Sequence, residues 1–144
     1  MNIHELIEVV KESALIVNKH FGTGFLEEVY KNALVVELRS RGIKAEPERE
    51  LLIYYKNEIV GKYRSDILVD DRLIIETKSI EALSKVHSMQ LVNYLCATKL
   101  DVGLLINFGF NFQLRTKTRI HRDPRFQYMK FSIDSHKAYN ESTE

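Results

Sequence analysis

The sequence has one cysteine and no long apolar run, and these two shortages exclude several classes of protein. Cys96 has no second cysteine to pair with, and one thiol cannot by itself hold zinc or an iron–sulfur cluster. No stretch approaches the ~18 uninterrupted apolar residues that a membrane-spanning helix requires. The N-terminus also lacks a basic leader followed by an apolar block. We therefore expect a cytoplasmic protein in a reducing compartment, with no membrane partner.

The sequence also has no large excess of positive or negative residues. The 21 Lys and Arg residues nearly balance the 20 Asp and Glu residues, which leaves a formal net charge of +1. No field of the whole molecule attracts a nucleic acid, so any such binding requires a local patch of basic residues.

One candidate basic patch lies between residues 111 and 130, where the only acid is Asp123. Its basic residues are Arg115, Lys117, Arg119, Arg122, Arg125 and Lys130. One interpretation assigns nucleic-acid binding to the first three of them. The other is a solvated edge strand, since Lys and Arg on an edge strand discourage pairing with other chains. The sequence favours neither interpretation.

Length and composition are those of one ordinary globular domain. The chain has 144 residues, of which 44% are hydrophobic and 28% are charged, close to the averages for folded proteins. There is no internal repeat and no low-complexity block. We expect a single domain over residues 1–134, followed by a polar, flexible tail over residues 135–144 that has little to bury.

Two helices are predicted near the N-terminus. Apolar residues recur every three or four positions from Ile3 to Phe21 and again from Leu26 to Leu38, so each helix has one apolar face. Gly22 and Gly42 follow these segments, and glycine is typical of the residue after a helix. We expect the two helices to pack against each other.

After residue 42 the sequence changes to β-branched and aromatic residues with turn residues between them. Strands are predicted at 50–55, 59–69, 73–78, 102–108 and 113–120, and a helix at 82–97. The strand at 73–78 opens with the apolar run Leu73-Ile74-Ile75, which predicts a central place in the sheet, and the basic strand at 113–120 is predicted at an edge. In the helix, the spacing puts Leu83, Val86, Met89 and Asn93 on one side and His87, Gln90 and Tyr94 on another.

Three charged residues on neighbouring strands form the candidate reaction centre. Residues two apart on a strand point the same way about 6.6 Å apart, so Glu76 and Lys78 share one face. Glu-x-Lys is common on solvated strands, but here it ends an apolar run, where charges are rare unless paired or bound to a metal. Asp66, in the preceding strand, supplies a second carboxylate. Two acids so close repel each other unless a cation or a shared proton lies between them.

The turn between these strands decides whether the two acids meet. A two-residue loop of Asp70 and Asp71 would place Asp66 opposite Ile75 and turn Glu76 to the other side of the sheet. A three-residue connection, or a β-bulge, instead pairs Asp66 with Glu76. We predict that second register because it separates the polar from the apolar residues.

Several motifs resemble those of one nuclease superfamily. Arg64-Ser65-Asp66, Glu76-Thr77-Lys78 and Gln90-Leu91-Val92-Asn93-Tyr94 resemble the strand, strand and helix signature of PD-(D/E)xK nucleases with a Q-x-x-x-Y helix. Gly24-Phe25-Leu26-Glu27-Glu28-Val29-Tyr30 resembles the motif of the bacterial GxxExxY proteins. The resemblance spans roughly residues 5 to 110. Ser65 stands where the superfamily has Pro, and Thr77 where an apolar residue is commoner.

The resemblance implies a fold, a metal and a set of roles. The fold would be α/β, with a restriction-endonuclease-like core, a central mixed β-sheet flanked by helices, and two N-terminal helices. Asp66, Glu76, Glu27 and the Thr77 carbonyl would hold Mg²⁺ or Mn²⁺, which prefer oxygen ligands. Lys78 would stabilise charge on the phosphate, and Gln90 and Tyr94 would orient Lys78. An iron–sulfur cluster, which some relatives carry, is excluded by the single cysteine.

The implied function is metal-dependent hydrolysis of phosphodiester bonds, most readily in DNA. The alternative is a non-catalytic module that keeps the nuclease fold and binds a nucleic acid or a protein. An inert relative would be expected to lose Asp66, Glu76 or Lys78, and all three are present. Individual residues also have structural explanations. Glu27 suits the first turn of a helix in any protein, and Tyr94 could simply pack the helix on the sheet. The sequence leaves a homo-oligomer open.

Overall fold

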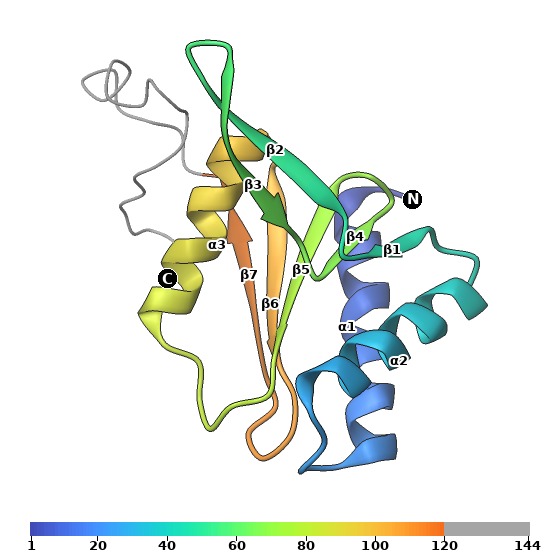
Figure 1. The fold of residues 1–144 in the computed structure, drawn as a ribbon. Coiled ribbons are helices and arrows are strands. Elements are labelled where there is room, and N and C mark those ends of the chain that lie inside the picture. Colours follow the sequence, from blue (N-terminus) through green and yellow to red (C-terminus); the bar gives the residue numbers. More distant parts are fainter. Residues whose placement is uncertain (120–144) are drawn as a thin grey trace.

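The chain folds into a mixed β-sheet with helices on both faces (Figure 1). The computed structural model describes residues 1–119, so the predicted domain end at residue 134 and the predicted tail lie outside the described residues. The helices are α1 (Ile3–Phe21), α2 (Glu27–Ser40) and α3 (Lys85–Thr98). The strands are β1 (Ala45–Pro47), β2 (Glu50–Tyr55), β3 (Glu58–Arg64), β4 (Ile67–Val69), β5 (Leu73–Lys78), β6 (Val102–Asn107) and β7 (Gln113–Thr118).

The main sheet has five strands in the order β1-β4-β5-β6-β7. β5 and β6 run parallel and the other neighbours run antiparallel, so the sheet is mixed as predicted. Within residues 1–119, β5 lies in the middle of the sheet and β7 at an edge, which agrees with both predictions. β2 and β3 form a separate two-stranded ribbon that projects beyond the sheet (Figure 1).

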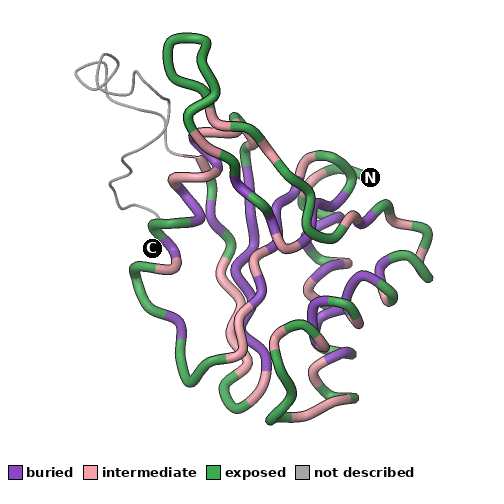
Figure 2. The backbone as a smooth tube through the Cα atoms, in the orientation of Figure 1, coloured by how far each residue is buried: buried purple, intermediate pink, exposed green. Residues whose placement is uncertain are grey.

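Two apolar layers hold the sheet between the helices. Leu73 and Ile75 of β5 pack with the apolar faces of α1 and α2, whereas Ile74 packs on the opposite side with residues of α3. β5 is therefore buried on both faces, as the purple sheet strands in Figure 2 show. Because both faces of the first half of this strand are covered, that half is the apolar run Leu73-Ile74-Ile75 rather than an alternating pattern.

The predicted C-terminal ends of α1 and α2 are confirmed, and the structure adds a cap at the start of α1. Asn2 accepts a hydrogen bond from the Glu5 N–H, and Glu5 returns one to Asn2, which caps the start of α1. Gly22 and Gly42 have φ of 68° and 79°, a region that glycine enters without steric penalty. Arg41, beyond the end of α2, lies 2.9 Å from Glu12 of α1, so the two helices pack together as expected.

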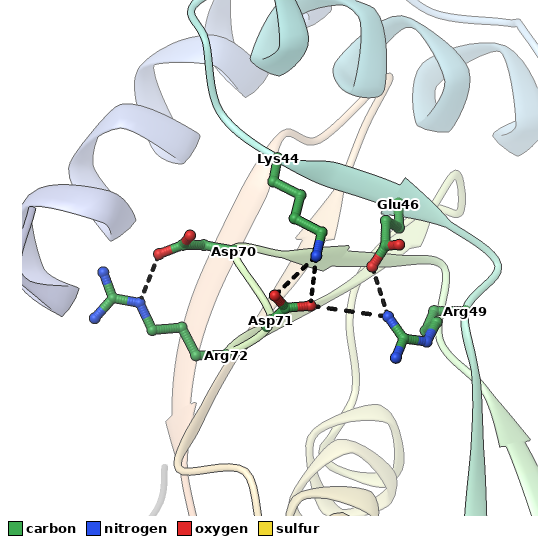
Figure 3. Close-up of polar contacts among 6 residues, drawn as sticks. All are labelled: Lys44, Glu46, Arg49, Asp70, Asp71 and Arg72. Carbon is green, nitrogen blue, oxygen red and sulfur yellow. Dashed lines mark hydrogen bonds and ion pairs between the residues drawn. The ribbon is translucent and has the colours of Figure 1, made fainter.

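The β4–β5 turn has three residues, as predicted. The Arg72 N–H donates to the Val69 carbonyl, and Lys44 lies 2.9 Å from the carboxylate of Asp71 (Figure 3). Val69 consequently pairs with Leu73, and Ile67 with Ile75. The same register carried one residue further sets Asp66 beside Glu76, so the turn brings the two acids together.

The predicted strand at 59–69 is wrong, because the chain turns at Ser65 and Asp66. The Ser65 N–H donates to the Arg49 carbonyl, and the Glu48 N–H donates to the Asp66 carbonyl. These bonds end β3 at Arg64, so β3 pairs with β2 in the ribbon and β4 joins the main sheet. β1, which was not predicted, pairs with β4 over three residues, too few for a recognisable pattern.

The predicted faces of α3 are also wrong in part. Ser84 caps the helix, which starts at Lys85 rather than 82. Val86 and Met89 are exposed, whereas the buried residues of the helix are Ser88, Leu91, Val92, Leu95 and Cys96. Apolar residues occur on several sides of this helix, so periodicity alone does not select the face that meets the sheet.

Gly103 allows α3 to approach β6 closely. A Cβ at this position would lie 3.0 and 3.2 Å from the two Leu91 methyl carbons and 3.3 Å from the Ile74 carbonyl oxygen. We expect Gly103→Ala to lower the free energy of unfolding by about 1–3 kcal/mol, measured by urea denaturation. Gly61→Ala in β3 is the control, since its nearest atom would lie at 3.9 Å. Equal stability of both variants would contradict this packing.

Candidate active site

Asp66 is held against the backbone of β5. Its Oδ2 accepts hydrogen bonds from the Thr77 N–H at 2.7 Å and from the Thr77 hydroxyl at 3.1 Å. These bonds are available because the strand break leaves Asp66 just before β4, beside the end of its partner strand. The aspartate is therefore fixed next to Glu76.

Glu76 lies on the face of β5 that α3 covers, where the hydroxyl of Tyr63 donates a hydrogen bond to its carboxylate. Burial, and then the charge of Asp66, raise the pKa of Glu76 to about 8. Two carboxylates in this relation require a proton or a cation at neutral pH. The predicted meeting of Asp66 and Glu76 is confirmed.

Glu76 lines a small pocket together with three other predicted site residues, Lys78, Gln90 and Tyr94. Its volume is about 20 Å³, room for about one water molecule. β5 contributes the glutamate and the lysine from one face, and α3 contributes the glutamine and the tyrosine from adjacent turns. The strand motif and the helix motif thus converge on one volume, although their residues are far apart in the sequence.

Glu27 approaches from the first turn of α2, on the other side of β5. The Thr77 hydroxyl lies 3.4 Å from its carboxylate and 3.1 Å from that of Asp66. Burial and the charge of Asp66 raise the pKa of Glu27, and the charge of Lys78 partly offsets this rise. Glu27 therefore belongs to the surroundings of the acid pair, with Thr77 between them.

The residues of this site suit a hard divalent cation that takes only a few of its ligands from the protein. Within residues 1–119, no group of three or more His, Cys, Asp or Glu side chains is placed to hold a metal ion together. Asp66 and Glu76 provide two carboxylates, and Mg²⁺ typically takes one or two of these and keeps several waters. Burial of Glu76 and the charge of Asp66 raise the pKa of Glu76, and a cation bound between the two carboxylates would oppose that rise.

Tyr63 is a site residue that sequence reasoning missed. Its ring stacks on that of Tyr94 with centroids 3.7 Å apart and planes 8° apart, and its hydroxyl donates to Glu76. Tyr63 comes from the β2–β3 ribbon, and no local motif marks it. Its role depends on how the ribbon folds back over the end of α3.

The contacts of Glu76 predict two opposite pKa changes. Because the Tyr63 hydrogen bond lowers the pKa of Glu76, Tyr63→Phe should raise it and leave the ring stack intact. Asp66→Asn should lower it, because a neutral neighbour no longer repels the ionised glutamate. Carboxyl NMR titration of the metal-free protein measures both. Shifts in the same direction would contradict the geometry.

His87 also lines the pocket. Its Nδ1 accepts a hydrogen bond from the Ser84 N–H at 3.1 Å, which places the proton of the neutral ring on Nε2. Burial, followed by the charges of Lys78 and Arg115, lowers the pKa of His87. The ring is accordingly a neutral hydrogen-bond donor at physiological pH.

The three basic residues predicted to bind nucleic acid have different surroundings. Arg115 donates to Ser88 of α3 at 3.1 Å, and Arg119 lies 2.9 Å from Asp101. Lys117 is buried, on the face of β7 that also carries Arg115. They do not form an exposed basic strip in the described part of the chain. The patch's other basic residues, Arg122, Arg125 and Lys130, lie outside it.

No helix in residues 1–119 has the length and apolar character needed to cross a membrane. Among solved structures, one titled "Crystal structure of SSO0001" is similar, with a TM-score of 0.55 and 20% sequence identity. The similarity covers 71% of this chain and 54% of that chain, so this chain spans about half of the other protein. At this identity the likeness concerns the fold alone, and it agrees with the α/β core described above.

No curated protein matches the chain. A family model described as the PD-(D/E)XK nuclease superfamily matches residues 4–122, which includes every residue of the acid pair and its pocket. The chain therefore belongs to the PD-(D/E)XK nuclease superfamily.

Proposed function

We propose that this protein is a metal-dependent nuclease that hydrolyses phosphodiester bonds, with DNA as the favoured substrate and Mg²⁺ or Mn²⁺ as the cofactor. The observation that carries the proposal is the half-buried, adjacent pair of Asp66 and Glu76 next to Lys78, in a chain of this superfamily. The motif around Glu27 and Tyr30 further suggests the GxxExxY group within the superfamily. We also propose one domain over residues 1–134 and a cytoplasmic location.

Asp66 and Glu76 would hold the cation, with Glu27 and the Thr77 carbonyl as further oxygen donors. When bound, a divalent ion supplies positive charge to a phosphate and makes water more acidic. Thr77 keeps Asp66 in place through two hydrogen bonds, and Tyr63 does the same for Glu76. Each carboxylate is therefore oriented before the ion arrives, which reduces the reorganisation that binding requires.

Lys78 would place its ammonium beside the phosphate, where negative charge grows during hydrolysis. It shares the pocket with Gln90 and Tyr94, which would restrict its position. Tyr94 is itself held by the stack with Tyr63. The neutral His87 offers an Nε2–H that could donate to a phosphate oxygen at the same pocket.

The proposal is tested with purified protein and labelled single- and double-stranded DNA and RNA, in Mg²⁺, Mn²⁺ or chelator. We expect cleavage with either metal, none with chelator, and none with Asp66→Asn. Cleavage that persists in Asp66→Asn would come from a contaminant. The competing candidate is a non-catalytic binding module, which the lack of a three-ligand cluster in residues 1–119 would suit. Equal binding by wild type and variant without any cleavage would support that module.

A further inference from the structure

Buried Asn107 ties together two loops at the carboxyl end of β5. Its Oδ1 accepts a hydrogen bond from the Ile80 N–H at 3.0 Å, and its Nδ2 donates to the Ile80 carbonyl at 2.8 Å. The same Nδ2 donates to the Asn111 carbonyl at 3.0 Å. The side chain is 0% exposed, so these bonds form in a setting where leaving them unmade would be costly. The loops that follow β5 and β6 therefore have defined positions.

The loop between α1 and α2 joins this framework. The Ser79 hydroxyl donates to the Phe25 carbonyl at 3.2 Å, and the Gly109 N–H donates to the side chain of Asn18 at 2.9 Å. Near these loops, Tyr30 of α2 stacks on Phe108, which follows β6, with ring centroids 4.9 Å apart. Figure 1 shows the three loops at the same end of the sheet, below β5 in that view.

These fixed loops carry exposed apolar side chains. Phe110 and Leu26 are each 79% exposed, Phe25 is 45% exposed and Ile80 is 37% exposed. We call these four residues the loop platform. Exposure of these apolar side chains does not stabilise the fold, and hydrogen bonds hold their loops in place. The platform is therefore a surface suited to a partner.

The loops that carry the platform meet the candidate active site at the backbone of Lys78. The Phe108 N–H donates to the carbonyl of Lys78 at 2.8 Å, and Phe110 follows two residues later. Ile80 comes two residues after Lys78 in the other direction along the chain. A polymer with its phosphate at Lys78 would thus bring a neighbouring part of its chain to the platform.

The charge balance identifies which kind of nucleic acid suits this surface. Binding to a duplex depends mainly on Lys and Arg side chains that contact the phosphates. This chain has a net charge of +1, and both Arg115 and Arg119 already contact other residues of the protein. Single strands gain much of their affinity from bases that stack on aromatic side chains. Bases in a duplex are stacked on each other and cannot do this.

We propose that the loop platform, with Phe110 as its main contact, stacks unpaired bases of a single-stranded nucleic acid whose phosphate lies at Lys78. The inference rests on the proposed nuclease function and adds the form of its substrate. Stacking does not distinguish deoxyribose from ribose, so both single-stranded DNA and single-stranded RNA are tested.

The first test uses the absence of tryptophan from the chain. Phe110→Trp introduces one fluorophore at the platform, and Val36→Trp introduces one at the exposed outer face of α2, 67% exposed in the wild type. Each is titrated in chelator with single-stranded DNA, single-stranded RNA and blunt duplex. We expect single strands to quench the Phe110→Trp emission and leave Val36→Trp unchanged. Equal quenching by the duplex, or none by either single strand, would overturn the inference.

The second test separates stacking from general apolar contact. We expect Phe110→Ala and Phe110→Leu each to weaken single-strand binding by about 5- to 100-fold, measured by fluorescence anisotropy in chelator. Val36→Ala should bind as the wild type does. Full affinity in Phe110→Leu would indicate a protein-docking surface and overturn the proposal. So would self-association that Phe110→Ala abolishes without changing oligonucleotide binding.

These binding tests need no catalysis, so their failure is distinct from failure of the proposed function. Platform binding without metal-dependent cleavage would refute the nuclease and leave the stacking of single strands on the platform standing. Cleavage of single strands that Phe110→Ala leaves unchanged would refute the inference and leave the nuclease standing.

Discussion

Glu76→Gln is expected to abolish cleavage and to stabilise the metal-free protein at pH 8. The pKa of Glu76 is raised from an ordinary value of 4.5 to about 8, so the folded state favours the protonated side chain. The stability that this preference contributes is fully present below pH 4.5 and is lost as pH rises through about 8. Glutamine imitates the protonated acid at every pH, so the variant does not lose this stability.

The size of the effect follows from the linkage between pKa and stability. One pKa unit corresponds to about 1.4 kcal/mol, and we expect a gain of about 2 kcal/mol for Glu76→Gln at pH 8 after relaxation of the site. Urea denaturation in chelator at pH 5 and pH 8 measures the difference between the variants. The gain should be small at pH 5. Glu58→Gln, at an exposed position of β3, is the control and should show no such pH dependence.

Two outcomes would contradict this account of Glu76. A variant that is less stable than wild type at pH 8 would mean that the glutamate is not held in an unfavourable environment. Retained cleavage in Glu76→Gln would remove the residue from the proposed metal site. A gain in stability together with a loss of activity would show that this position is kept for function at the expense of the fold.

Lys78→Ala is expected to reduce cleavage by about 10²- to 10³-fold and to leave the fold intact. The ammonium is a source of positive charge in the pocket, and alanine leaves the carboxylates in place. Mn²⁺ binding, measured by calorimetry, should therefore persist while the rate of hydrolysis falls. Lys11→Ala on α1, far along the chain from the pocket, should have wild-type activity.

A second measurement on Lys78→Ala reports the position of the side chain without any substrate. The charge of Lys78 lowers the pKa of His87, so its removal should raise that pKa, as seen by NMR titration of the imidazole. An unchanged His87 titration would mean that the lysine points away from α3. In that case its assignment to the pocket would be wrong, whatever the cleavage rate.

Local chemistry was sufficient to predict much of the fold. The C-terminal ends of α1 and α2 follow from Gly22 and Gly42, which adopt positive φ and act over a few residues. The central place of β5 follows from its apolar run, because only a strand covered on both faces has such a sequence. These features depend on neighbours in the chain and are visible in it.

Features that depend on distant partners were not predictable. The break at Ser65 results from hydrogen bonds to residues 48 and 49, and the sequence around the break, residues 62–69, contains no Gly or Pro that would have indicated it. The helix α3 has apolar residues on several sides, so its buried face depends on how it packs against the sheet. The place of Tyr63 depends on the ribbon, which the predicted continuous strand would not have allowed.

By itself, the sequence determined which reactive groups the site contains and the register that joins Asp66 to Glu76, because a three-residue turn and strand alternation act locally. Only the tertiary structure decided what surrounds them. Tyr63 from the ribbon, Gln90 from α3 and Glu27 from α2 reach one strand end from three directions. The raised pKa of Glu76 arises from the resulting burial, a property that no single segment of the chain possesses.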